Sequence, residues 1–208
     1  WVWIKDRDTS QHHRLADSVR GVKKNLKSDQ ADPENTTDSN NGMASFDSDG
    51  FTLTADNDDH GYNANGSSQI SWNWKAGGGQ GSSNTDGSIN TTYTSVNTTA
   101  GFSISKYTGT GSNATVGHGL GTAPTVVIIK NLSASGKSWQ VGHKSIGFQN
   151  GIYLNLTDGQ ASDSGAFNST APTSSVFSVG TSSLVNDSGN IYVAYCFAEK
   201  TGYSKLGS

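Results

Sequence analysis

Residues 109–130 read GTGSNATVGHGLGTAPTVVIIK, and this stretch decides the fold class of the chain. Residues 126–129 (VVII) form an unbroken apolar run of strong strand formers. Gly117, Gly119, Gly121 and Pro124 lie just before the run, so the chain must turn tightly before it enters the strand. A short apolar run without polar alternation is typical of a strand covered on both faces, so we expect this strand to be central and buried.

The composition around this strand favours many short strands. Of the 208 residues, 15% are charged and 32% are hydrophobic, and most of the polar remainder is Ser, Thr, Asn and Gly. These polar residues alternate with short β-branched and aromatic runs, which indicates strands joined by turns rather than disorder. We therefore predict an all-β protein of antiparallel β-sandwich or jelly-roll-like modules in tandem, with at most one short helix.

The helix and the core can be placed by pattern. Leu15, Val19, Val22 and Leu26 recur at spacings of three and four, which predicts the short surface helix within residues 7–28. The predicted core consists of apolar and aromatic residues of the later strands: Val127, Ile129, Trp139, Val141, Tyr153, Phe177, Val193, Tyr195 and Phe197.

The sequence contains an internal repeat. The matching segments are WVWIK (1–5) with TVVIIK (125–130), GVKKNL (21–26) with GIYLNL (151–156), SDGFTLT (48–54) with SVFSVGT (175–181), and SSQISWNWKAG (67–77) with SGNIYVAYCFAEK (188–200). The matches keep an offset of about 125 residues, which is typical of tandem repeats. The alignment places Lys5 against Lys130, Ile70 against Val193, Trp72 against Tyr195, and Trp74 against Phe197.

The repeat suggests a domain organisation. We expect a partial first β-module in residues 1–77, a Gly/Ser-rich linker in 78–87 and a complete second β-module in 88–202. Residues 203–208 (YSKLGS) resemble SISKYTG (103–109), as the start of a following repeat would. A first module without its opening strands should borrow a partner strand from a neighbour or another chain. The opening on Trp1, without Met, suggests a piece of a longer polypeptide.

Several motifs together carry a resemblance to a known group of proteins. They are KYTGTGSNATVGHGLGTAP, VVIIKN, SFDSDGFTL, SWNWKAGG and YVAYCFAEKTGYSKLGS. The set resembles repeated modules in virion structural or tail-fibre-like proteins of marine tailed bacteriophages. The resemblance implies a virion surface location and brings no catalytic residues with it.

Acidic residues are the candidates for a structural calcium site. Asp56, Asp58 and Asp59 follow one another closely, and Asp47 and Asp49 precede them. Calcium prefers several oxygen ligands, which such a loop could supply. The order of residues departs from an EF-hand because Phe51 stands where a third oxygen ligand belongs, so a solvated turn is the favoured interpretation.

Possible glycan contacts are His118, Trp72 and Trp74. His118 lies between two glycines in the turn before the central strand, where a loop-holding histidine is the favoured alternative. Trp72 and Trp74 alternate along one strand and share a face, so core packing is the default and sugar stacking would require exposure. The single cysteine, Cys196, lies among strand formers and is expected to be a buried, inert thiol.

The remaining features separate the function classes. The net charge of -3 gives no reason to expect nucleic acid, and no apolar stretch is long enough for a membrane helix. No catalytic motif is present, which favours a non-enzymatic protein. Together with the virion context that the resemblance implies, this leads us to predict a virion module for assembly and host-surface adhesion. Its expected partners are other virion proteins, host glycans and further copies in a homo-oligomer, for which a trimer is the favoured state. The alternatives are a phage polysaccharide depolymerase or glycan-binding module, and a bacterial adhesin or extracellular matrix protein.

Overall fold

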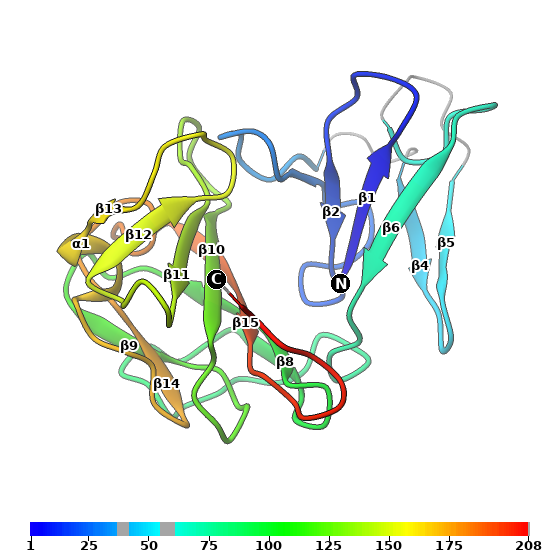
Figure 1. Cartoon of the computed structure of the whole chain (residues 1–208). Coiled ribbons are helices and arrows are strands. Elements are labelled where there is room, and N and C mark those ends of the chain that lie inside the picture. Colours follow the sequence, from blue (N-terminus) through cyan, green and yellow to red (C-terminus); the bar gives the residue numbers. More distant parts are fainter. Residues whose placement is uncertain (37–41, 55–60, 208) are drawn as a thin grey trace.

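The computed structural model describes residues 1–36, 42–54 and 61–207, and this part of the chain is an all-β protein with one short helix (Figure 1). The first strands are β1 (Val2–Asp6), β2 (Arg14–Ala16), β3 (Leu26–Lys27), β4 (Met43–Phe46), β5 (Phe51–Leu53) and β6 (Gln69–Asn73). They are followed by β7 (Tyr93–Asn97), β8 (Phe102–Thr108), β9 (Ala114–Gly117), β10 (Val126–Asn131), β11 (Gln140–His143), β12 (Asn150–Tyr153), β13 (Ala161–Ser162), α1 (Ser164–Phe167), β14 (Val176–Val179) and β15 (Ile191–Phe197). The predicted all-β class is confirmed.

The strands form four layers. A four-stranded N-terminal sheet has the order β3-β2-β1-β6, and a seven-stranded main sheet has the order β13-β12-β11-β10-β15-β8-β7. These two sheets face each other across a shared aromatic core, as in a β-sandwich. The β9–β14 pair and α1 cover the other face of the main sheet, and the β4–β5 hairpin covers the outer face of the N-terminal sheet (Figure 1).

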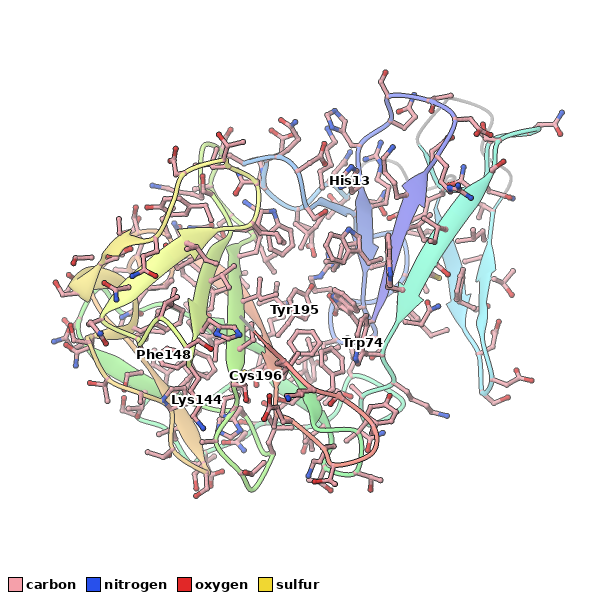
Figure 2. The ribbon with its side chains drawn as sticks, viewed as in Figure 1. His13, Trp74, Lys144, Phe148, Tyr195 and Cys196 are labelled. Carbon is pink, nitrogen blue, oxygen red and sulfur yellow. The ribbon has the colours of Figure 1, made fainter. Side chains whose placement is uncertain are left out.

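Strand β10 is covered on both faces, as its unbroken apolar run predicts. Val127 and Ile129 are fully buried in the core beneath β9 and β14. Val126 and Ile128 point the other way and pack against the core shared with the N-terminal sheet. The neighbouring β15 is divided in the same manner, and Figure 2 shows Tyr195 in the space between the two sheets.

Strand pairing reproduces the sequence repeat with identical register. Lys5 of β1 lies opposite Ile70 of β6, and Lys130 of β10 lies opposite Val193 of β15. The same equivalence holds for Val2–Asn73 with Val127–Cys196, Trp3–Trp72 with Ile128–Tyr195, and Ile4–Ser71 with Ile129–Ala194. The sheet order β3-β2-β1-β6 likewise matches β12-β11-β10-β15. We call these two sets of four strands the first and the second unit.

One segment of the sequence alignment is wrong by four residues. Leu26 lies opposite Leu15 in the first unit, and Ile152 lies opposite Val141 in the second. Leu26 is therefore equivalent to Ile152, whereas the match of GVKKNL with GIYLNL places it against Leu156. Leu156 is exposed instead, because it lies beyond the end of β12.

The predicted helix within residues 7–28 is wrong. Leu15 belongs to β2 and Leu26 to β3, and the residues between them form turns. Gly21 (φ 96°) and Lys23 (φ 62°) adopt left-handed backbone conformations that interrupt any helix. The helical spacing arises because Leu15, Val19 and Leu26 all face one core from separate strands and turns. The short helix lies instead at α1.

The predicted core is correct at eight of nine positions, since all except Tyr153 are buried. Tyr153 is partly exposed at the end of β12, near the edge of the main sheet.

Residues 78–87, expected to be a linker, make close contacts with β7. Ser82 forms a β-bridge with Thr94, and a Cβ atom on Gly81 would lie 1.9 Å from the carbonyl oxygen of Thr94. Gly81 also has φ of +78°, which disfavours other residues. We expect Gly81→Ala to lower the free energy of unfolding by about 2–3 kcal/mol in chemical denaturation.

The matched control is Gly79→Ala, because Gly79 has open space around its Cβ position. This change should alter the free energy of unfolding by less than about 0.5 kcal/mol. Equal, negligible effects of the two substitutions would show that the segment is a flexible linker.

Cys196 is fully buried in the core between the main sheet and the β9–β14 pair. Burial raises the pKa of its thiol to about 12, so the reactive thiolate is scarce near neutral pH. We expect the native protein not to react with a thiol-specific disulfide reagent, and the unfolded chain to release one equivalent. Rapid modification of the native protein would contradict the burial of this side chain.

Candidate functional site

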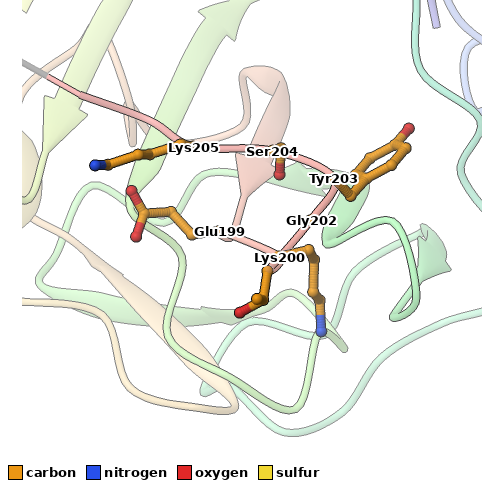
Figure 3. Close-up of a pocket in the computed structure, with 7 residues that line it drawn as sticks. Glu199, Lys200, Gly202, Tyr203, Ser204 and Lys205 are labelled. Atoms are coloured by element: carbon orange, nitrogen blue, oxygen red, sulfur yellow. The ribbon is translucent and has the colours of Figure 1, made fainter.

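An aromatic pocket lies where β6 ends, and we call it the Trp74 pocket. Its volume is about 480 Å³, and its lining comes from the start of β1, Ser18, the β4–β5 hairpin, the end of β6 with the residues that follow, and the C-terminal turn. The side chains that matter chemically are Phe46, Asp47, Asp49, Phe51, Trp74, Lys75 and Tyr203. Tyr203 lies at the tip of the C-terminal turn, on the side away from Glu199 and Lys205 (Figure 3).

The aromatic rings of the Trp74 pocket differ in exposure. Trp74 is partly buried and packs edge-on against Trp1 and Phe197, with ring centroids 5.1 and 5.7 Å apart, so the core fixes its orientation. Tyr203 is 61% exposed, the largest exposed fraction among the described large hydrophobic side chains. A ligand that enters the pocket therefore meets one rigid ring and one accessible ring.

Hydrogen bonds hold the polar side of the pocket in place. The ammonium group of Lys75 donates to the carbonyl oxygen of Ser48 at 2.9 Å and so connects β6 to the β4–β5 turn. The Asp47 carboxylate accepts hydrogen bonds from the hydroxyls of Ser45 and Thr52 at 2.8 and 2.9 Å.

The described side chains of this pocket match a sugar-binding surface better than the carboxylate pair of a glycoside hydrolase. Aromatic faces beside carboxylate oxygens and an ammonium group suit a sugar, whose C–H face stacks on rings and whose hydroxyls form hydrogen bonds. Glycoside hydrolysis needs two carboxylates placed across a cleft. Asp47 and Asp49 instead lie two residues apart on one turn, and the Asp47 carboxylate already accepts two hydrogen bonds.

The structure separates the two predicted tryptophans. Trp72 is outside the Trp74 pocket and is 43% exposed, with its ring 5.7 Å from that of Trp3. Trp3 also lines a groove of about 380 Å³ together with the exposed side chains Leu154 and Leu156. The default expectation of core packing is thus correct for Trp74 and wrong for Trp72.

His118 is fully buried and has no surface for a glycan. Its Nδ1 accepts a hydrogen bond from the backbone N–H of Leu120 at 3.1 Å, and its Nε2 lies 3.2 Å from the carbonyl oxygen of Thr173. Burial lowers the pKa of His118, which favours the neutral ring. The favoured interpretation, a histidine that holds a loop, agrees with this geometry, and the glycan contact is corrected.

The calcium candidates Asp56, Asp58 and Asp59 lie outside the described residues. Within the described ranges, no group of three or more His, Cys, Asp or Glu side chains is arranged to hold a metal ion. The single helix found there is too short to cross a membrane.

Buried charges occur between the sheets, where they stabilise the fold. The Asp17 and Arg20 side chains are fully buried and form an ion pair at 2.5 Å. The hydroxyl of Tyr195 donates to Asp17 at 2.7 Å across the two sheets. Arg20 also donates to Glu34 at 3.2 Å and to the carbonyl oxygen of Leu15 at 3.0 Å. The Asp17 and Arg20 side chains have no exposed surface on which a substrate could bind.

Lys130 is a second perturbed group, and the repeat explains it. Burial lowers the pKa of Lys130 to about 8, a range in which a lysine can act as a base. Its Nζ donates to the carbonyl oxygen of Lys137 at 2.6 Å, in the loop after β10. The equivalent Lys5 donates to the carbonyl oxygen of Gln11 at 3.1 Å, in the loop after β1. Because both units use this lysine to clamp a loop, its role is structural.

Sequence reasoning missed Phe46, Phe51 and Tyr203 of the pocket. These residues come from segments that are far apart in the chain, and no local pattern links them.

Comparison with known proteins adds one finding. A family model described as a domain of unknown function (DUF7483) matches residues 1–208. No curated protein matches the chain, and no solved structure matches it.

Proposed function

Since the chain belongs to the DUF7483 family, whose description states no function, we propose a function on physical grounds. The protein is a non-enzymatic structural module of a virion surface appendage, such as a tail fibre, and it adheres to host-surface glycans. The observation that carries the proposal is the duplication: two units share one strand order, one register and one loop-clamping lysine. When such units recur along a fibre, the same surface is presented many times.

The Trp74 pocket supports the adhesive part of the proposal. It offers an accessible tyrosine, a fixed tryptophan and oxygen acceptors in a shallow surface site. Such sites bind single sugar units weakly, and repetition along a fibre raises the overall affinity through multivalency.

The test of adhesion is a binding screen with bacterial capsular and lipopolysaccharide glycans. We expect binding without product release, and Tyr203→Ser should weaken it at least about tenfold, or about 1.4 kcal/mol. Tyr153→Ser is the matched control, because Tyr153 is a partly exposed tyrosine of β12 that does not line the pocket. Product release would establish the depolymerase alternative, and equal binding by both variants would exclude this pocket.

The virion location is tested by labelling purified particles with antibodies raised against the chain. Label on a particle appendage is expected, whereas label on the bacterial envelope would establish an adhesin or matrix protein. We also propose a homo-oligomer, threefold in fibres, tested by light scattering. The contacts are expected at the segment from Trp1 to Leu26, where Leu15, Val19 and Leu26 are buried within the chain and residues 7–10 and 22–23 are exposed.

A further inference from the structure

Strand β6 is the edge of the N-terminal sheet, although its counterpart in the second unit is not an edge. β6 pairs with β1 alone among the described strands, whereas β15 lies between β10 and β8. The two strands occupy the same position in their units, with the same register to β1 and β10. Within residues 1–36, 42–54 and 61–207, the first unit therefore has no counterpart of the strand that β8 supplies to the second.

The backbone of β6 presents a regular row of hydrogen-bonding groups at this edge. Trp1 and Trp74 exchange two backbone hydrogen bonds of 3.0 Å, so residues 70, 72 and 74 bond to β1. The N–H and C=O groups of Gln69, Ser71 and Asn73 then point away from β1. Their equivalents Tyr192, Ala194 and Cys196 lie opposite Tyr107, Ser105 and Ser103 of β8.

Side-chain exposure shows the same difference between the units. Trp72 is 43% and Ile70 is 39% exposed, whereas the equivalent Tyr195 and Val193 are fully buried. In the second unit, Phe102 and Ile104 of β8 lie beside Phe197 and Tyr195 and help to cover them.

Strand β6 has none of the sequence features that usually prevent an edge strand from pairing with another strand. The sequence QISWN contains no proline and no charged residue, and it pairs with β1 over all five residues without a bulge. Free edges of this kind bind other strands unless they are blocked.

We propose that the free edge of β6 binds an extended strand of the β8 type from another unit of this repeat. The strand runs antiparallel to β6, with small residues in register with Ser71 and Asn73 and apolar side chains beside Trp72 and Trp74. The chain itself carries a further β8-like sequence in residues 203–207, outside both sheets, so such strands recur with the repeat. This inference concerns how units join and holds whether or not the module binds glycans.

The test uses a fluorescent peptide with the β8 sequence GFSISKYTG (residues 101–109) and the full chain, followed by fluorescence anisotropy. We expect saturable binding that Ser71→Pro weakens at least tenfold. Proline removes the outward N–H of residue 71 and leaves the hydrogen bonds between β6 and β1 intact. Ser71→Thr is the matched control and should bind as the original chain does.

Two controls distinguish loss of binding from loss of folding and specific binding from non-specific binding. Circular dichroism and the unfolding midpoint establish that Ser71→Pro is folded, and a peptide with serine in place of its Phe and Ile should not bind. The proposal is overturned if the β8 peptide does not bind, or if folded Ser71→Pro binds it as tightly as Ser71→Thr does.

Discussion

Replacing Asp17 with alanine is expected to lower the free energy of unfolding by about 3–5 kcal/mol, because the change leaves the buried charge of Arg20 without its partner. The Asp17 carboxylate also accepts hydrogen bonds from the backbone N–H groups of Val19 and Arg20 at 3.0 and 2.8 Å. The loss extends to the second unit, since Tyr195 donates its hydroxyl to the same carboxylate. Chemical denaturation measures the change.

The control for this prediction is Asp158→Ala, which removes an exposed carboxylate and should change stability by less than about 0.5 kcal/mol. A similar small loss for Asp17→Ala would contradict the proposed role of the buried pair.

The contribution of the Asp17 carboxylate to the stability of the fold is expected to depend on pH. Burial alone would raise the pKa of Asp17, but the Arg20 charge and the hydrogen bonds from Tyr195 and Arg20 outweigh burial and lower it below 3.8. A lowered folded-state pKa means that the stabilisation is present above the ordinary pKa and is lost as the pH falls through the folded value. The stability difference between the original chain and Asp17→Ala should therefore shrink in strong acid.

Trp139→Ala is expected to have a comparably large effect, about 3–5 kcal/mol, because it opens a cavity in the core that both sheets share. Trp139 is fully buried and stacks on Tyr195, with ring centroids 6.4 Å apart. Its indole N–H donates to the carbonyl oxygen of Lys27 in the N-terminal sheet at 3.0 Å. Trp139 directly precedes β11. Its replacement should therefore destabilise both units together, in a single unfolding transition.

Trp72→Ala provides the comparison, since the same change at a side chain that is 43% exposed should cost about 1 kcal/mol or less. Two separate transitions in the Trp139→Ala variant, with only the later one shifted, would show that the units do not share a core.

The positions of individual strands and the register between the repeats were predictable from the sequence, because both depend on local patterns of residues. The VVII run identified β10 as a doubly covered strand, and the matches around Lys5 and Lys130 gave the correct register for β1 and β10. The alternation of Ile70, Trp72 and Trp74 identified β6 and its shared face.

Other features depend on partners far away in the chain and could not be predicted. The spacing of Leu15, Val19 and Leu26 suited a helix equally well. The Asp17–Arg20 pair and the hydrogen bond from Tyr195, both of which hold the turns in place, are not visible in that spacing. The exposure of Trp72 depends on the strand that is absent beside β6, a property that the sequence of β6 does not contain.

Amide hydrogen exchange at two equivalent positions, Ser71 and Ala194, tests most directly whether β6 is a free edge while its counterpart β15 is paired. The units are structural repeats, but Ala194 is paired with β8 and Ser71 faces an open edge. We expect fast exchange at Ser71 and strong protection at Ala194 in the isolated chain, with Ser71 gaining protection when the β8 peptide is added. Equal protection of both amides in the isolated chain would show that β6 is not a free edge.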